Sequence, residues 1–267
     1  MALKPAIINV MEAAARKAAR SLVHDFGEVE QLQVSKKGPS DFVSNADLKA
    51  ERILRRELGK GRPRFGLLME ESGEEQGEDS SNRWIVDPLD GTTNFLHGLP
   101  HFAISIAHER DGEIVAAVVH EPIREEMFWA ERGTGAYLND RRIRVSARTR
   151  LSDALIATGI PFRGRETHPR YMDTLAAVVP KIAGIRRFGS AALDLAYVAA
   201  GRYEGFWEFG LSSWDIAAGI LLVREAGGLV SEVEGGAMML ETGSILAATE
   251  LLHGELGVVV RGALGGG

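Results

Sequence analysis

The sequence contains no cysteine among its 267 residues. This absence excludes disulfide frameworks, zinc sites built from thiolates and enzymes with a cysteine nucleophile, so a bound metal would need oxygen or imidazole ligands. No uninterrupted apolar run reaches the roughly 18 residues of a membrane span. No dense block of lysine and arginine occurs, and the formal net charge is −6, so we expect no dedicated nucleic-acid binding. The sequence predicts a soluble, cytoplasmic protein that would need cations to bind phosphates.

The first half of the chain predicts two helices that precede a strand meander. A helix over residues 1–26 is followed by a turn at 38–41 and a second helix over 46–58. An apolar strand at 65–69 leads into a polar loop at 72–82 that we expect to be mobile. Further predicted strands cover residues 84–86, 102–108, 114–120, 127–130 and 142–145.

The N-terminal pattern has two interpretations. Its basic residues on an amphipathic helix can mimic an organelle transit peptide. We favour an ordinary core-facing helix, whose apolar stripe consists of Ile8, Met11, Ala15, Ala18 and Leu22.

The second half alternates strands and helices, which is typical of α/β layering. The predicted strands are at residues 155–158, 185–188, 206–208 and 229–233. The predicted helices are at about 169–183, 190–200 and 213–226. Because no repeat or long linker occurs, we expect a single catalytic unit over residues 1–267, with a soft internal division between 1–147 and 148–267.

Several carboxylates stand where predicted strands end or helices begin. Glu70, Glu71, Asp87, Asp90 and Asp215 share this placement, whereas a solvated face would scatter its charges. The apolar residues before Asp87 would shield it from water, and a shielded carboxylate without a partner has a large desolvation cost. A cation would relieve that cost, which favours a metal site.

The turn Asp87-Pro88-Leu89-Asp90-Gly91 has the chemistry of a magnesium site. Mg²⁺ prefers oxygen ligands in near-octahedral geometry, and the turn offers two carboxylates and the carbonyl of Leu89. Pro88 restricts the backbone and Gly91 permits an unusual dihedral angle, so both carboxylates can point inward. Taken alone, the turn could also be a capped β-turn.

Two predicted helix starts follow strands and could receive an anion. The segments 91–94 and 189–191 would each leave backbone N–H groups free for a phosphoryl group. The helix after Ser190 is apolar nearly all round, which predicts burial. Asp215 stands at a third helix start and, taken alone, could be only a favourable early aspartate.

With these motifs the sequence resembles the inositol monophosphatase family, especially its bacterial SuhB-type branch. The resemblance runs from about residue 11 to residue 249 and rests on Glu70-Glu71-Ser72, the run from Trp84 to Phe95, the run from Arg187 to Tyr197, and the run from Trp214 to Gly219. It implies a fold of the α/β class, an αβαβα five-layer sandwich of the sugar-phosphatase type. We also expect a homodimer.

The resemblance implies two to three Mg²⁺ ions. Glu70, Asp87 and the Leu89 carbonyl would hold the first ion. Asp87, Asp90 and Asp215 would hold the second, and Glu70 with waters would hold a weaker third.

The resemblance further implies the catalytic residues Glu70, Asp90, Thr92 and Asp47. Thr92, paired with Asp47, would help to activate the attacking water. Glu208 would accept hydrogen bonds from substrate hydroxyl groups, although it could instead be a solvated glutamate at a strand end. The residues implied to contact the substrate are Glu70, Asp90, Gly91, Thr92, Gly189, Ser190, Ala191, Glu208 and Asp215.

The chain departs from the family pattern at two positions near the motifs. Met69 stands where the family usually has glycine, and Gly98 where it often has a basic residue. Neither is an implied ligand. The glycine-rich run after Thr249 is short, so we expect a curtailed last helix.

The resemblance implies a lithium-sensitive phosphomonoesterase that hydrolyses myo-inositol 1-phosphate. We predict direct attack by a metal-activated water, without a phosphoenzyme. Relatives with the same motifs hydrolyse fructose 1,6-bisphosphate, histidinol phosphate or 3′-phosphoadenosine nucleotides, and these substrates stay as alternatives. A haloacid-dehalogenase-type mechanism does not fit, because its two aspartates stand two residues apart and Asp87 and Asp90 stand three apart. SuhB-type relatives are linked with transcription and RNA-processing complexes, so a regulatory role is a further alternative.

Overall fold

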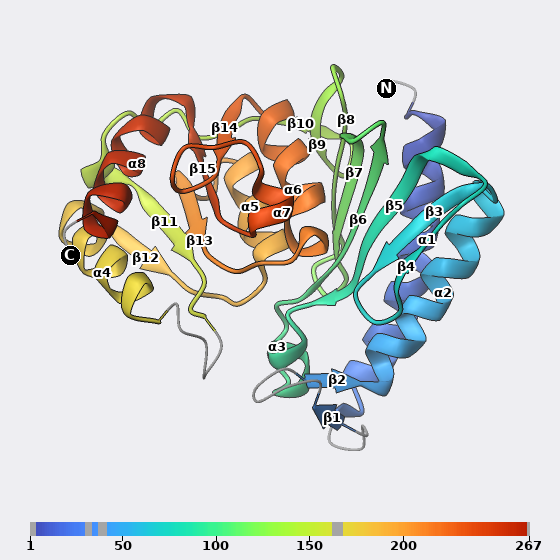
Figure 1. The fold of residues 1–267 in the computed structure, drawn as a ribbon. Helices are drawn as coiled ribbons and strands as arrows, with labels where there is room; N and C mark the ends of the chain where they lie inside the picture. The colour runs from blue at the N-terminus through green and yellow to red at the C-terminus, as the bar shows by residue number, and fades with distance from the viewer. Residues whose placement is uncertain (1–3, 30–33, 37–41, 162–167, 266–267) are drawn as a thin grey trace.

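The computed structural model describes residues 4–29, 34–36, 42–161 and 168–265. These residues form five layers in the order helix, sheet, helix, sheet, helix (Figure 1). The predicted αβαβα sandwich of the α/β class is therefore confirmed. The turn predicted at residues 38–41 lies outside the described residues.

The first layer consists of helices α1 (Ala6–Phe26) and α2 (Asn45–Gly61), which pack against each other and against the first sheet. α1 forms because its apolar residues recur at helical spacing. Its predicted apolar stripe is fully buried, so the stripe has the predicted core role: Ile8, Met11, Ala15, Ala18 and Leu22.

The first sheet has eight strands in the order β10-β9-β8-β7-β6-β5-β3-β4. Neighbouring strands are antiparallel except for β3 and β5, which are parallel. A separate antiparallel pair is formed by β1 (Val34–Lys36) and β2 (Phe42–Ser44). The bounds in the large sheet are β3 Phe65–Met69, β4 Gly73–Glu75, β5 Asp79–Asp90, β6 Ala103–Arg110, β7 Glu113–Glu121, β8 Glu126–Glu131, β9 Gly135–Leu138 and β10 Arg141–Ile143.

The prediction of a loop at residues 72–82 was wrong. The segment forms β4 and the beginning of β5, and the predicted strand at 84–86 is only the middle of β5. β4 is the edge strand of its sheet, and its residues are exposed or half-buried. A strand at a wet sheet edge needs no apolar residues, so the polar composition gave no strand signal.

The middle layer consists of α5 (Ala191–Ala199) and α6 (Ser213–Glu225), which lie between the two sheets (Figure 1). Every residue of α5 is buried, as predicted from its apolar sequence. α5 packs against β13 (Gly205–Glu208) and β15 (Ile245–Thr249) of the second sheet and also against β7 of the first. α6 packs against β6 and β7 of the first sheet and also against β14 (Gly228–Ser231) of the second. Short helices α3 (Thr92–Leu96) and α7 (Met239–Thr242) join neighbouring elements.

The second sheet has five strands in the order β12-β11-β13-β15-β14. β11 is parallel to β12 and β13, whereas β15 is antiparallel to β13 and β14. The bounds are β11 Leu155–Thr158, β12 Gly184–Arg186, β13 Gly205–Glu208, β14 Gly228–Ser231 and β15 Ile245–Thr249. No strand was predicted over β15.

The fifth layer consists of α4 (His168–Val178) and α8 (Glu250–Leu264), which pack together on the outer side of the second sheet. The helix predicted to reach residue 183 ends at Val178, and a short 3-10 turn over Val179–Lys181 follows it. α8 has 15 residues, so the expectation of a curtailed last helix was wrong. Within the described ranges no helix has the length and hydropathy of a membrane span.

Gly219 on α6 offers a direct test of the middle layer. A Cβ added to Gly219 would lie 2.5 Å from the Cβ of Leu195 on α5, so the glycine permits the close approach of the two helices. We expect Gly219→Ala to lower the free energy of unfolding, measured by urea denaturation, by about 1–3 kcal/mol.

Gly254→Ala on α8 is the matched control, because an added Cβ there meets nothing within 4 Å. It should stabilise the fold by up to about 1 kcal/mol, since alanine is the better helix former. Equal effects of the two substitutions would contradict the tight packing of α5 on α6.

Candidate active site

A cavity of about 440 Å³ lies where strands β5 and β13 end and where helices α3, α5 and α6 begin. Five carboxylate side chains line it: Glu70, Asp87, Asp90, Glu208 and Asp215. Every predicted site residue except Asp47 lines this cavity: Glu70, Asp87, Leu89, Asp90, Gly91, Thr92, Gly189, Ser190, Ala191, Glu208 and Asp215.

An irregularity in β5 brings Asp87 and Asp90 to the same side of the strand. Asp87 lies opposite Ser105 of β6, and Asp90 lies opposite Ala103, so two residues of β5 face one residue of β6. In a regular strand, residues three apart point to opposite faces. The extra residue shifts the alternation by one position, so that Asp87 and Asp90 point to the same face. Pro88 sits at the bulge and has no N–H to give to the strand ladder.

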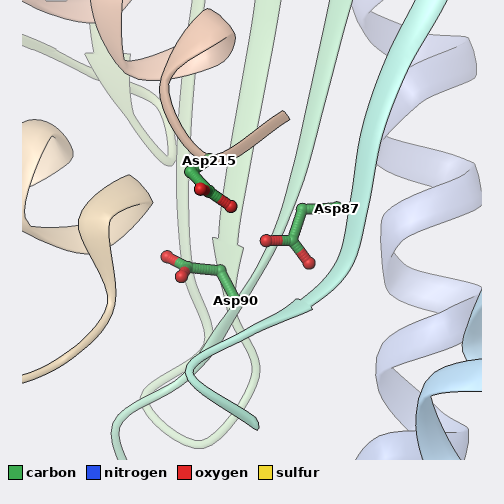
Figure 2. A group of neighbouring side chains, drawn as sticks. All are labelled: Asp87, Asp90 and Asp215. Carbon is green, nitrogen blue, oxygen red and sulfur yellow. The ribbon is translucent and has the colours of Figure 1, made fainter. Parts of the chain in front are cut away.

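Asp87, Asp90 and Asp215 form one cluster, to which Asp87 and Asp90 come from β5 and Asp215 from the start of α6 (Figure 2). One oxygen of each carboxylate lies within 4.8 Å of those of the other two. Hydrogen bonds hold each carboxylate in place and so fix its orientation. They are Leu89 N to Asp87 Oδ1 (2.9 Å), Ser190 Oγ and Ala192 N to Asp90 Oδ2 (2.5 and 2.8 Å), and Ser212 N to Asp215 Oδ2 (2.7 Å).

Burial raises the pKa of all three carboxyl groups, and the charges of neighbouring carboxylates raise it further. The pKa values of Asp87 and Asp215 lie well above the ordinary value of 3.8. Burial raises the pKa of Asp90 to about 6, although the hydrogen bonds from Ser190 and Ala192 oppose this. A buried group of oxygen donors that repel one another fits a divalent cation, which would supply the positive charge.

Asp47 does not line the cavity but contacts Thr92, which does. It is fully buried near the start of α2, where it forms a capping box with Ser44. Its Oδ1 lies 3.2 Å from Thr92 Oγ1, and the Leu89 carbonyl oxygen lies 3.0 Å from the same atom, so the single hydroxyl proton of Thr92 has two acceptors within reach. Burial raises the pKa of Asp47 to about 6. The predicted pairing of Asp47 with Thr92 is therefore present in the structure.

Two helix starts face the cavity, as predicted. Gly91 precedes α3 in the left-handed conformation (φ 97°), and an added Cβ there would lie 3.1 Å from the carbonyl oxygen of His101. Because α3 has only five residues, its free N–H groups matter more than its dipole. α5 begins after Ser190, whose hydroxyl accepts from Leu193 N and donates to Asp90.

Glu208 adds a further acidic group to the cavity wall. Glu208, at the end of β13, lies against Gly159, where any side chain would overlap its carboxylate. Asp194, one turn into α5, is buried, and its Oδ1 has no hydrogen-bond partner among the described residues. Burial and the charge of Glu208 raise the pKa of Asp194 well above its ordinary value. Glu208 suits a ligand that donates hydrogen bonds, whereas Asp194 is not among the residues that line the cavity.

Sequence reasoning missed Ser44 and Asn94. The spacing Ser44-x-x-Asp47 is a capping-box signal that could have identified Ser44. Asn94 Nδ2 donates to the carbonyls of His101 and Phe188, and no local pattern indicates the second contact because it joins residues 94 apart. Glu71 was grouped with the positioned carboxylates, but it is not among the residues that line the cavity.

Comparison with known proteins agrees with this site. Residues 4–261 match the inositol monophosphatase family. The chain is 59% identical to "Inositol-1-monophosphatase" from Rhizobium meliloti, over 97% of each chain. It is 48% identical to "Nus factor SuhB" from Pseudomonas aeruginosa, over 90% of each chain.

A solved structure, that of the extragenic suppressor protein suhB from Bartonella henselae, superposes with a TM-score of 0.94 at 59% identity. The superposition covers 96% of this chain and 99% of the other. The resemblance predicted from the motifs is thus confirmed. The chain belongs to the inositol monophosphatase family, a family of phosphatases.

Proposed function

We propose that this phosphatase hydrolyses myo-inositol 1-phosphate to inositol and phosphate and requires Mg²⁺. The observation that carries the proposal is the cluster of Asp87, Asp90 and Asp215 beside two helix starts on the wall of one cavity. A cation and a phosphoryl group can bind there side by side. The Rhizobium meliloti relative named "Inositol-1-monophosphatase" supports the choice of substrate.

The ligands proposed for two to three Mg²⁺ ions are Glu70, Asp87, the Leu89 carbonyl, Asp90 and Asp215. When bound, Mg²⁺ neutralises the phosphoryl oxygens and lowers the pKa of water. The hydrogen bonds to the three aspartates hold these ligands ready, so little reorganisation is needed on binding.

The chain's own residues orient the substrate and move a proton. The N–H groups of Gly91 and Thr92 would bind phosphoryl oxygens. Asp47, through the Thr92 hydroxyl, would take the proton of the attacking water, and its pKa of about 6 suits a general base near neutral pH. Asp90 and Glu208 would accept hydrogen bonds from the hydroxyl groups of the substrate. Contacts to Gly189, Ser190 and Ala191 would complete the substrate subsite.

We also propose that the two halves of the chain act as a single catalytic unit. The protein would be cytoplasmic, and two copies of the chain would form a homodimer. The first half supplies Asp90 and the second half supplies Ser190, which donates to it, so neither half contains the whole site. Light scattering of the purified protein should give twice the chain mass, and a monomer mass would rule out the dimer.

A role as a partner of transcription complexes is a second candidate. It is supported by the 48% identity to "Nus factor SuhB" of Pseudomonas aeruginosa. Recovery of transcription factors in a pull-down from cell extract would support it, and their absence would count against it.

A phosphate-release screen tests the choice of substrate. With Mg²⁺ present, we expect the highest kcat/KM for myo-inositol 1-phosphate and lower values for fructose 1,6-bisphosphate, histidinol phosphate and 3′-phosphoadenosine nucleotides. Lithium should inhibit the activity. A higher kcat/KM for one of the other three substrates would replace the proposed substrate.

Asp90→Asn should remove a ligand shared by metal and substrate. We expect kcat/KM in saturating Mg²⁺ to fall by more than about 100-fold, the upper end of the effect of losing a group that only supports a ligand. The matched control is Asp153→Asn, because Asp153 is exposed and pairs with Arg150; its activity should stay normal. Near-normal turnover by Asp90→Asn would show that Asp90 is not a ligand.

The same substitution should change how stability depends on pH. The pKa of Asp90 is 3.8 ordinarily and about 6 in the fold, so between these values the folded state retains a proton that the unfolded state has released. Stability is therefore lost as the pH rises through this range. In EDTA, Asp90→Asn should gain about 2 kcal/mol in free energy of unfolding over wild type as the pH rises from 4 to 6.

Urea denaturation of both proteins at each pH measures this difference. Saturating Mg²⁺ should stabilise the wild type more than the variant. A difference that stays constant from pH 4 to pH 7 would mean that the Asp90 carboxylate is not destabilising in the metal-free fold.

A further inference from the structure

Asn94 connects two parts of the chain that are far apart in sequence. It lies on α3, four residues after Asp90, and is only 7% exposed. Its Nδ2 donates to the carbonyl of His101 at 2.8 Å and to the carbonyl of Phe188 at 2.6 Å. The amide thus holds two backbone segments, and the segment at Phe188 leads directly into α5.

The same two segments meet a second time at Asp90. Asp90 Oδ2 accepts from Ser190 Oγ at 2.5 Å, and Ser190 stands two residues after Phe188. Gly189, between them, is in the left-handed conformation (φ 80°). Asp90 accepts from Ser190 Oγ and from Ala192 N, and Asn94 adds a contact at Phe188, before Ser190. Contacts on both sides of Gly189 therefore fix the direction in which α5 begins.

The chemistry of this contact requires an amide. Two carbonyl oxygens need two donors from one atom, and the Asn94 NH₂ group supplies both without a charge. Because both donors are used, this group is not available to donate to a ligand. An aspartate would place an oxygen against two carbonyls, and a leucine would leave both carbonyls without this donor.

Building on the proposed function, we propose that Asn94 is a positioning residue of the metal site. Its hydrogen bond to the Phe188 carbonyl holds that segment beside α3, which follows Asp90 and Gly91. Ser190 then donates to Asp90 in one geometry, and this orients the Asp90 carboxylate toward the cation. The substrate contacts proposed at Gly189 and Ala191 depend on the same stretch. Asn94 lines the cavity, but both of its N–H donors are used by backbone carbonyls, so it acts on metal affinity and substrate affinity together through the backbone that it holds.

The test measures Mg²⁺ binding in Asn94→Leu and in wild type. The readout is the Mg²⁺ concentration that gives half of the maximal rise in thermal midpoint. We expect this concentration to increase by about tenfold or more, as is typical when a group that orients a metal ligand is lost. In saturating Mg²⁺, the KM for myo-inositol 1-phosphate should rise more than kcat falls. Asn94→Ser, which keeps one donor, should show a smaller shift and serves as the test if the leucine variant does not fold.

Asn82→Leu is the matched control. Asn82 lies on β5, outside the active-site cavity, and also makes two side-chain hydrogen bonds, to Asp79 (3.0 Å) and His108 (2.7 Å). Its loss should lower the thermal midpoint but leave the Mg²⁺ concentration for half-maximal stabilisation unchanged.

Two outcomes would overturn the proposal, and a third would overturn the function on which it rests. Folded Asn94 variants with the wild-type Mg²⁺ response would show that Asn94 does not position the site. An equal shift in Asn82→Leu would show only a general loss of stability. No Mg²⁺ response in the wild type itself would instead refute the proposed function on which the inference rests.

Discussion

The mutual repulsion of Asp87, Asp90 and Asp215 is the constraint around which this structure is organised. Buried like charges would move apart if they were free, so the fold must hold them together. A bulge in β5 aligns two of them, and α5 and the first turn of α6 hold two of the three carboxylates with hydrogen-bond donors. Burial, together with the charges of the neighbouring carboxylates, raises the pKa of all three groups and so disfavours their charged forms. A bound cation would supply the opposite charge and remove this repulsion, so the same arrangement favours cation binding.

The middle layer turns this local arrangement into a stable site. The bodies of α5 and α6 are apolar and are packed between two sheets, while polar groups at their N-terminal ends, Ser190 and Asp215, face the cavity. Ser190 and Asp215 are therefore placed by core packing and not by flexible loops. Gly219 permits the close approach of the two helices, and Asn94 on α3 donates to the carbonyl of Phe188, just before α5. Packing and chemistry thus depend on the same contacts.

The sequence identified the parts of the site that depend on local pattern. Asp87 and Asp90 follow an apolar run, and Ser190 precedes an apolar helix. All three residues could therefore be assigned to the site from the sequence. The bulge could not, because it depends on the register of β5 against β6, which the pattern of one strand does not contain. The hydrogen bonds of Ser190 and Asn94 across the cavity were missed for a similar reason, since they join residues about a hundred apart. The polar edge strand β4 and the helix α8 were also misjudged, because tertiary packing outweighed composition there.

The central claim is that the three aspartates form a cation site. Anomalous diffraction from crystals grown with Mn²⁺ tests it most directly, because Mn²⁺ prefers the same oxygen ligands as Mg²⁺ and its position is seen independently of the protein. The account predicts a strong peak in contact with Asp87, Asp90 and Asp215. Crystals in which Mn²⁺ binds elsewhere, with no peak between these three carboxylates, would contradict it.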